Sequence, residues 1–149
     1  MNEHRQRALK SSALWVTGIN IVLVLIHSVA HEVLRVKATP AQLAFIVPFI
    51  LVGPPAAGAL LPKWTKAGAR VLLASMIGSF FFGLYYHFVA DTIDHVSHVA
   101  RMEPALWSWA FRATAYLLLV FNAWGAFGAG RLLAAESQPS EHYAARTGV

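Results

Sequence analysis

Long uncharged stretches alternate with short charged segments along the chain. Four of these stretches are each close to the roughly 20 residues that a helix needs to cross the hydrocarbon layer of a bilayer. Their apolar residues run continuously instead of alternating with polar ones, which indicates helices and not the strands of a membrane barrel. The four stretches are residues 13–30, 38–62, 71–90 and 113–130.

This pattern predicts an all-α fold, a polytopic membrane four-helix bundle that occupies residues 1–134 as a single domain. Pro40 and Pro104 suit the first turns of the second and fourth spans. Residues 135–149 are small and polar without periodicity, so we expect a disordered cytoplasmic tail there. The expected spans are about 13–34, 40–61, 70–98 and 105–132.

The second span is expected to be irregular because it contains Pro48 and the triplet Gly53-Pro54-Pro55. Proline lacks a backbone N–H and its ring clashes with the carbonyl four residues earlier, so the helix should be kinked at Pro48 and at Pro54-Pro55. An ordinary kink and a broken helix that lines a cavity both fit this sequence.

Composition agrees with a chain that faces lipid. Hydrophobic residues make up 57% of the 149 residues and charged residues only 13%, whereas about a quarter of an ordinary soluble domain is charged. The net charge of +5 does not indicate nucleic acid, because the basic residues are split among short segments between the apolar stretches. We therefore expect the lipid bilayer as partner and no nucleic acid, while a homo- or hetero-oligomer within the membrane stays open.

The same basic segments predict the orientation of the chain. If both termini and the second connection are cytoplasmic, seven of the ten basic residues that flank the spans lie inside, as the positive-inside rule expects. We expect a multi-pass protein of the plasma membrane with both termini in the cytoplasm. The seven residues are Arg5, Arg7, Lys10, Lys63, Lys66, Arg70 and Arg131.

The N-terminal region also permits a second interpretation. Its basic residues, the following apolar stretch and the small residues Ser28 and Ala30 fit a signal peptide cleaved after Ala30, which would leave three spans. Asn20 and His27 interrupt the apolar region that a signal peptide requires, which favours a first span.

Five of the seven histidines lie in two clusters, one near the end of the first span and one at the end of the third. These two spans should run in the same direction, so both clusters are expected on the outer side at one membrane level. If the third helix continues to residue 98, three histidines and two acids lie within an arc of about 100° around the helix axis. That arc consists of His87, Asp91, Asp94, His95 and His98, and it would face His27 and His31.

Imidazole and carboxylate groups in this arrangement indicate a metal site, because both ligate transition metals and i, i+4 spacing brings two donors to one ion. Thiolate ligands are excluded because the chain has no cysteine. We expect a zinc, iron or copper ion at the outer ends of the first and third spans. The alternative is that these side chains are solvated at the membrane interface and the acids cap the helix. The expected ligands are His27, His31, His87, Asp91 and His95, with Glu32, Asp94, His98 and Arg112 as secondary candidates.

Arg112 should lie about two turns into the fourth span. An unpaired guanidinium at that depth costs about 3 kcal/mol or more, so we expect an ion pair with Asp91, Glu32 or Asp94. A contact with an anionic substrate or lipid headgroup is the alternative.

The segments His-Ser-Val-Ala-His at 27–31 and Asp-His-Val-Ser-His at 94–98 resemble the histidine boxes of membrane hydroxylases and desaturases. The resemblance covers about ten residues, and those families have more histidines, so it identifies no family for this chain. A small membrane oxidoreductase or a metal-handling protein is the preferred hypothesis. The alternatives are a b-type haem protein with one axial histidine from each cluster, a proton or ion transporter, and a noncatalytic accessory subunit of a membrane complex. The sequence does not decide whether the protein is an enzyme.

Overall fold

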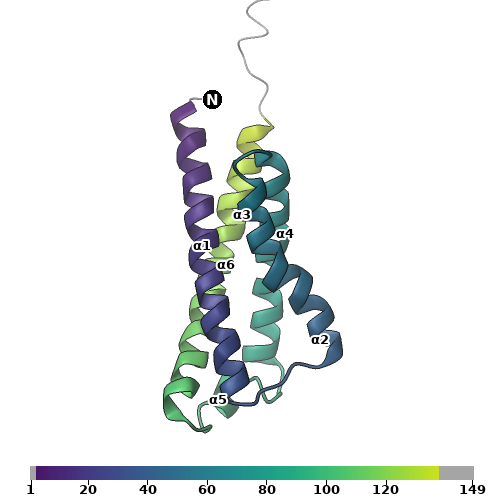
Figure 1. The fold of residues 1–149 in the computed structure, drawn as a ribbon, viewed down its shortest axis with the longest axis vertical. Helices are drawn as coiled ribbons and strands as arrows, with labels where there is room; N and C mark the ends of the chain where they lie inside the picture. Colours follow the sequence, from purple (N-terminus) through teal and green to yellow (C-terminus); the bar gives the residue numbers. More distant parts are fainter. Residues whose placement is uncertain (1–2, 138–149) are drawn as a thin grey trace, which may run out of the picture.

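The computed structural model describes residues 3–137, and within this range the chain is helical and contains no strand. Long helices run side by side along one axis, as Figure 1 shows. The elements are α1 (Glu3–Val33), α2 (Pro40–Phe45), the π-helix η1 (Ile46–Val52), α3 (Gly53–Leu60), α4 (Thr65–Leu84), the π-helix η2 (Tyr85–Val89), α5 (Val96–Val99) and α6 (Ala105–Glu136).

Four helical segments are long and apolar enough to cross a membrane, which confirms the four apolar helices expected from the sequence. Large apolar side chains such as Leu25, Trp124 and Phe127 are more than half exposed on the outside of these helices. A surface of this kind suits lipid better than water. The four segments are His4–Val33, Pro40–Leu60, Thr65–Val89 and Ala105–Glu136.

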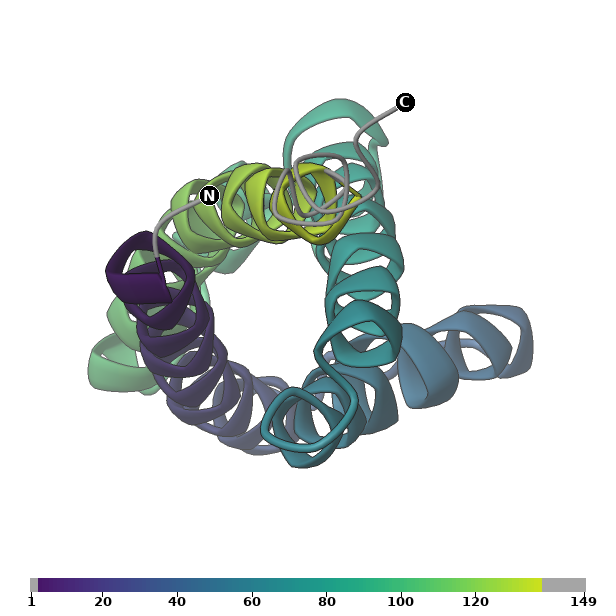
Figure 2. The same ribbon diagram turned by 90° about the horizontal axis from the view of Figure 1, so that it is seen from above.

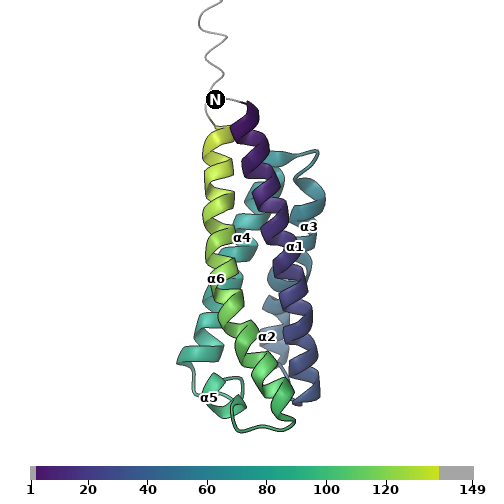
Figure 3. The ribbon, with the colours of Figure 1, turned by 90° about the vertical axis from the view of Figure 1, so that its left-hand side faces the viewer.

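The bundle has two distinct ends, which are visible in Figures 1 and 3. At the terminal end, α1 begins, α6 ends and the turn between α3 and α4 lies alongside them. The side chains of Gln6 and Glu136 hydrogen-bond there, and Lys10 Nζ donates to the carbonyl of Pro62 at 2.8 Å. At the α5 end, α1 and η2 end and α6 begins.

Each end of the bundle has its own apolar cluster, and a buried polar pair lies between them. Close helix packing at the terminal end leaves little room at Gly125, where an added Cβ would lie 2.9 Å from Met76 Sδ. Between the clusters, Asn20 Nδ2 of α1 donates to Asn122 Oδ1 of α6 at 2.8 Å. The terminal-end cluster is Ala13, Ala57, Leu61, Ala69, Leu72, Met76, Ala129 and Leu132, and the α5-end cluster is Ala30, Leu34, Val36, Val99 and Phe111.

The prolines of the second span fall where its backbone leaves α-helical geometry. Thr39 caps α2, since its Oγ1 accepts from Gln42 N at 3.3 Å while Gln42 Oε1 accepts from Thr39 N at 2.6 Å. Pro48 lies within η1, and Pro54 lies in the first turn of α3. Because prolines provide no N–H, a wider π segment takes the place of a regular helix here, and the span bends without breaking. Figures 1 and 2 show α2 diverging from the bundle beyond this segment.

The third helix ends earlier than the sequence predicted. The backbone of Ala90 is extended, with φ −75° and ψ 133°, so the helical run ends at Val89 instead of continuing to residue 98. Thr92 Oγ1 donates to the carbonyl of Tyr86 at 3.3 Å, and this provides a hydrogen-bond donor for one of the last carbonyls of the helix. The chain then turns into the short helix α5. The predicted single stripe from His87 to His98 on one helix face is therefore wrong.

The last helix continues beyond its expected end. Because α6 extends to Glu136, residues 135 and 136 are helical, and the expectation that the disordered tail begins at residue 135 is wrong for these two. The remainder of the expected tail, from residue 138, lies outside the described residues.

Candidate metal centre

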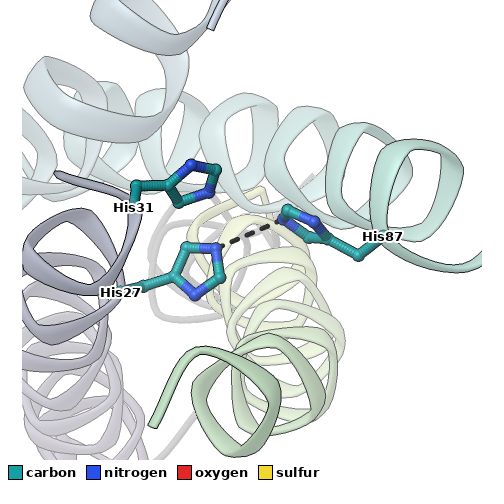
Figure 4. Close-up of side chains that lie close together, drawn as sticks. All are labelled: His27, His31 and His87. Carbon is teal, nitrogen blue, oxygen red and sulfur yellow. Dashed lines mark hydrogen bonds between the residues drawn. The ribbon is translucent and has the colours of Figure 1, made fainter. Parts of the chain in front are cut away.

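Three of the five expected ligands meet at the α5 end of the bundle, where His27 and His31 of α1 face His87 of η2 (Figure 4). One ring nitrogen of each lies within 4.8 Å of those of the other two. His27 and His87 are buried, and His31 is half-buried. We call this group the histidine triad. It confirms that the first and third helices end at the same level.

Thr114 of α6 fixes the His27 ring. The distance from His27 Nδ1 to Thr114 Oγ1 is 2.9 Å. The single hydroxyl proton of Thr114 is directed to the carbonyls of Ala110 and Phe111, at 2.7 and 3.0 Å. Thr114 therefore accepts from His27, whose Nδ1 must bear the proton and whose Nε2 in the neutral ring must bear a lone pair.

The carbonyl of Asp94 fixes the His87 ring in the same way. A carbonyl can only accept, so the 3.1 Å contact between His87 Nδ1 and Asp94 O places the proton on Nδ1. The π-helical turn of η2 and the early end of the helix allow the chain to fold back so that this carbonyl reaches the ring. The lone pair of His87 Nε2 is thus free.

The end of α1 fixes the His31 ring. Arg35 adopts φ 57°, and the N–H groups of Arg35 and Val36 donate to the carbonyls of Glu32 and His31 at 3.1 and 2.9 Å. These bonds form a Schellman motif, which reverses the chain at the C-terminus of a helix. The reversal brings the carbonyl of Val36 to within 2.9 Å of His31 Nδ1, so Nδ1 donates here as well.

All three imidazoles consequently donate through Nδ1 and keep Nε2 free. The Nε2 atoms of His27 and His87 are 3.3 Å apart, and two lone pairs facing each other at this distance repel. A metal ion or an added proton between them removes the repulsion. Two nitrogens bonded to one tetrahedral zinc ion at about 2.05 Å would be about 3.3 Å apart. Hydrogen bonds from the second ring nitrogen to carbonyl or hydroxyl oxygens are also the usual support for metal-bound histidines.

Phe111 of α6 forms an apolar wall shared by the three rings. It is fully buried, and its ring centroid lies 4.5, 4.7 and 5.3 Å from those of His27, His31 and His87. The wall excludes water from one side of the triad and restricts rotation of the imidazoles. Phe111 was not among the residues expected from the sequence, where only its position three residues before Thr114 indicated that the two share a helix face.

The other expected ligands, Asp91 and His95, are not part of the triad. Asp91 is exposed and pairs with His98, with 3.3 Å between His98 Nε2 and Asp91 Oδ1. His95 precedes α5, and its Nδ1 accepts from Ser97 N at 3.2 Å. His95 therefore uses this nitrogen lone pair as a helix cap. Both residues leave the site because the helix ends at Val89.

The secondary candidates also separate. Glu32 lines the pocket beside the triad and is exposed to the surface. Arg112 is half-buried and, among the residues that the structure describes, forms no ion pair with Asp91, Glu32 or Asp94. The expected ion pair is therefore wrong, and Asp91 is bound by His98 instead.

Asp94 is a buried acid next to the triad. Burial raises the pKa of its carboxyl above the usual range, and the nearby His31 partly opposes this shift. Asp94 lines the same pocket as the three histidines. It thus supplies a carbonyl that orients His87, while its carboxyl does not belong to the group that could hold an ion.

A pocket of about 460 Å³ adjoins the triad. His27, His31 and His87 line it together with apolar side chains from α1, η1, α4 and α6. The triad is therefore accessible from a cavity and not sealed inside the helix packing. A bound ion would have space beside it for a further ligand.

Comparison with known proteins gives no further assignment, since no family model, no curated protein and no solved structure matches the chain.

Proposed function

We propose that this chain is an integral membrane protein that binds one transition metal ion through His27, His31 and His87. The observation that supports this most directly is the convergence of three imidazoles, which each bring one ring nitrogen to within 4.8 Å of the others and are each fixed through Nδ1. Three imidazoles suit zinc best, and copper and iron next. A three-histidine site leaves a fourth position for water or substrate, which is the arrangement of catalytic zinc sites.

The ligand set therefore fits either a small membrane metalloenzyme or a protein that receives and passes on metal ions. A site for catalysis retains its ion through purification, whereas a site for transfer exchanges it rapidly with a chelator. The pocket beside the triad favours the enzyme, because a transfer site has no need of a cavity of about 460 Å³.

Metal content of the purified protein tests the proposal. We expect one equivalent of zinc per chain after loading and desalting, and less than about a tenth of that in His31→Gln, which alters the half-buried member of the triad. His95→Gln and His98→Gln are matched controls, since both histidines lie outside the triad, and each should keep the full equivalent. Metal-free wild-type protein, or an equal loss in the controls, would overturn the proposal.

A b-type haem is a second candidate. Two axial nitrogens on opposite sides of a haem iron, each bonded at about 2 Å, are about 4 Å apart with the macrocycle between them. The 3.3 Å separation of the His27 and His87 nitrogens favours a bare ion. An absorption spectrum of the same sample decides this, because a strong band near about 410 nm would identify haem.

A shared proton is the third candidate, because an imidazolium also satisfies two facing nitrogens, and the protein would then belong with proton or ion transporters. Such a path would have to pass the apolar cluster at the terminal end, which includes Leu61, Leu72 and Met76. Because an apolar cluster impedes the passage of protons, it favours a metal site over a proton path. Proton flux into liposomes that is lost in His87→Gln, with no metal bound to the wild type, would support the transporter.

We also propose that the four apolar helices span the plasma membrane with both termini in the cytoplasm. The excess of basic residues at the terminal end supports this orientation. The chain has no cysteine, so a maleimide that labels a single introduced cysteine shows on which side of the membrane that position lies. In intact cells, a membrane-impermeant maleimide should label Ala100→Cys after α5, and should label Ala67→Cys in α4 only after permeabilisation. The opposite labelling pattern would overturn the orientation.

A further inference from the structure

The pocket beside the triad is polar at the histidines, and the rest of its lining is mostly apolar, although it includes the polar residues Ser79 and Asn122. Its polar end contains the triad and Asp94. The apolar remainder is lined by Val24, Ile46, Ile50, Phe82, Leu118 and Leu119. Its volume of about 460 Å³ is in the usual range for a small-molecule site. A ligand that fills it must be amphipathic, with a polar group toward the histidines.

The pocket opens sideways, between α1 and the segment formed by α2 and η1. Five residues both line the pocket and are exposed, namely Ser28 and Glu32 of α1, Lys37 of the connection between α1 and α2, Leu43 of α2 and Leu51 of η1. α1 packs mainly on α6 and α3, whereas α2 packs on η1 and diverges from the bundle. The opening thus lies on the surface that we propose to face lipid, so a ligand can enter from the bilayer.

The opposite end of the pocket is closed. Asn122, which lines the pocket, is hydrogen-bonded to Asn20, and the apolar cluster of the terminal end follows beyond this pair. The ligand therefore enters and leaves through the same lateral opening. This arrangement suits a bound lipid-like molecule and not a solute that passes through the bundle.

The charges at the polar end indicate the headgroup. Glu32, Lys37 and Asp94 line the pocket with a formal charge of −1 together, so a bound dication would give this end a formal charge of +1. Oxygen donors with negative charge, such as a carboxylate, would occupy the open position of the ion. We infer that the pocket binds a single-chain, fatty-acid-like amphiphile whose oxygen headgroup ligates the metal while its alkyl chain lies among Val24, Ile50 and Leu119. This inference rests on the proposed metal site.

Hydroxamates of different chain length test it, because they ligate the ion with two oxygens. In nanodiscs, the cobalt-loaded protein should show visible cobalt bands that change when decanohydroxamic acid binds. We expect decanohydroxamic acid to bind at least about tenfold more tightly than acetohydroxamic acid, since the longer chain fills the apolar part of the pocket. Decanamide has the same chain without the chelating group and should leave the bands unchanged.

Ile50→Trp provides the matched variant, because it fills the pocket from η1 without altering a ligand. It should keep the cobalt bands and lose the preference for the longer chain. Val47→Trp, on the same π-helix but outside the pocket lining, is the control and should behave as the wild type.

The outcomes separate the two proposals. If the wild type shows cobalt bands but binds both hydroxamates equally, or if Ile50→Trp keeps the chain preference, the amphiphile site is overturned while the metal site stays. If the wild type shows no cobalt bands and binds no zinc, the metal site fails and the amphiphile site fails with it.

Discussion

His27 and His87 are 60 positions apart in the chain, yet their Nε2 atoms are 3.3 Å from each other in the bundle. Each ring is fixed through its other nitrogen, His27 by the hydroxyl of Thr114 and His87 by the carbonyl of Asp94. The hydroxyl of Thr114 comes from α6, whereas His27 lies on α1. The carbonyl of Asp94 comes from the chain beyond the end of η2, which contains His87. The contact is therefore the product of tertiary packing and not of a local sequence motif.

Replacing Thr114 by valine should weaken metal binding without removing a ligand. Valine has nearly the same shape but no acceptor, so the buried Nδ1–H of His27 would lose its partner and the ring could rotate. We expect a roughly 10- to 100-fold lower zinc affinity, the usual effect of losing such a support. Competition with a chelating dye measures it.

Thr114→Ser is the control for this variant, because it keeps the hydroxyl that accepts from His27. It should stay within a few-fold of the wild-type affinity. An affinity of Thr114→Val equal to that of Thr114→Ser would show that the hydroxyl does not orient the ring.

Arg35 sets the orientation of His31 through the end of α1. Its φ of 57° lies in the left-handed region, which costs a residue with a Cβ about 1–2 kcal/mol and is most unfavourable for β-branched side chains. Arg35→Val should therefore open the Schellman motif and withdraw the carbonyl of Val36 from His31 Nδ1. We expect weaker zinc binding than in the wild type, again by dye competition.

Arg35→Gly is the matched control, since glycine adopts this φ without strain. Zinc affinity should be kept in Arg35→Gly and lost in Arg35→Val. If both variants lose affinity, the arginine side chain and not the backbone turn is the important feature.

The sequence predicted the four apolar helices and the meeting of the first and third spans because both depend on long-range patterns of hydropathy. The apolar stretches determine the helices, and the common direction of the first and third spans brings His27, His31 and His87 to the same end of the bundle. These features need no knowledge of individual contacts.

The prediction that Asp91 and His95 lie beside the triad was wrong because the helical period was extended beyond the end of the helix. Asp91 and Thr92 have side chains that compete for backbone hydrogen bonds, and the chain leaves the helix at Ala90. Asp91 and His95 then belong to a loop and a cap. Two of the three supports of the triad, Val36 and Asp94, act through backbone carbonyls, which no side-chain pattern reveals.

The pair of Asn20 and Asn122 should stabilise the packing of α1 on α6. Their hydrogen bond of 2.8 Å is buried within the spans. Asn20→Leu or Asn122→Leu alone leaves one amide unpaired and should lower the free energy of unfolding by about 1–2 kcal/mol. Unfolding in mixed detergent micelles measures this.

The double variant Asn20→Leu/Asn122→Leu removes both amides and leaves no unpaired group. We expect it to be less destabilised than the sum of the two single variants, with a coupling energy of about 0.5–2 kcal/mol. Strictly additive losses would mean that the two amides do not depend on each other.

Gly53 permits the close approach of the second span to α4, and a methyl group there should destabilise the bundle. An added Cβ would lie 2.0 Å from Ser75 Oγ and 3.0 Å from both Ser75 Cβ and the carbonyl of Pro48. Gly53→Ala must therefore push α3 away from α4, at a cost of about 1–3 kcal/mol, and a lower Tm in detergent should report it.

Gly128→Ala is the matched control, because nothing lies within 4 Å of its added Cβ and alanine favours the helix. Gly53→Ala/Ser75→Gly removes both contacts with Ser75 and should recover part of the lost Tm. An unchanged Tm in Gly53→Ala, or no recovery in the double variant, would show that the two helices do not pack as closely as the structure has them.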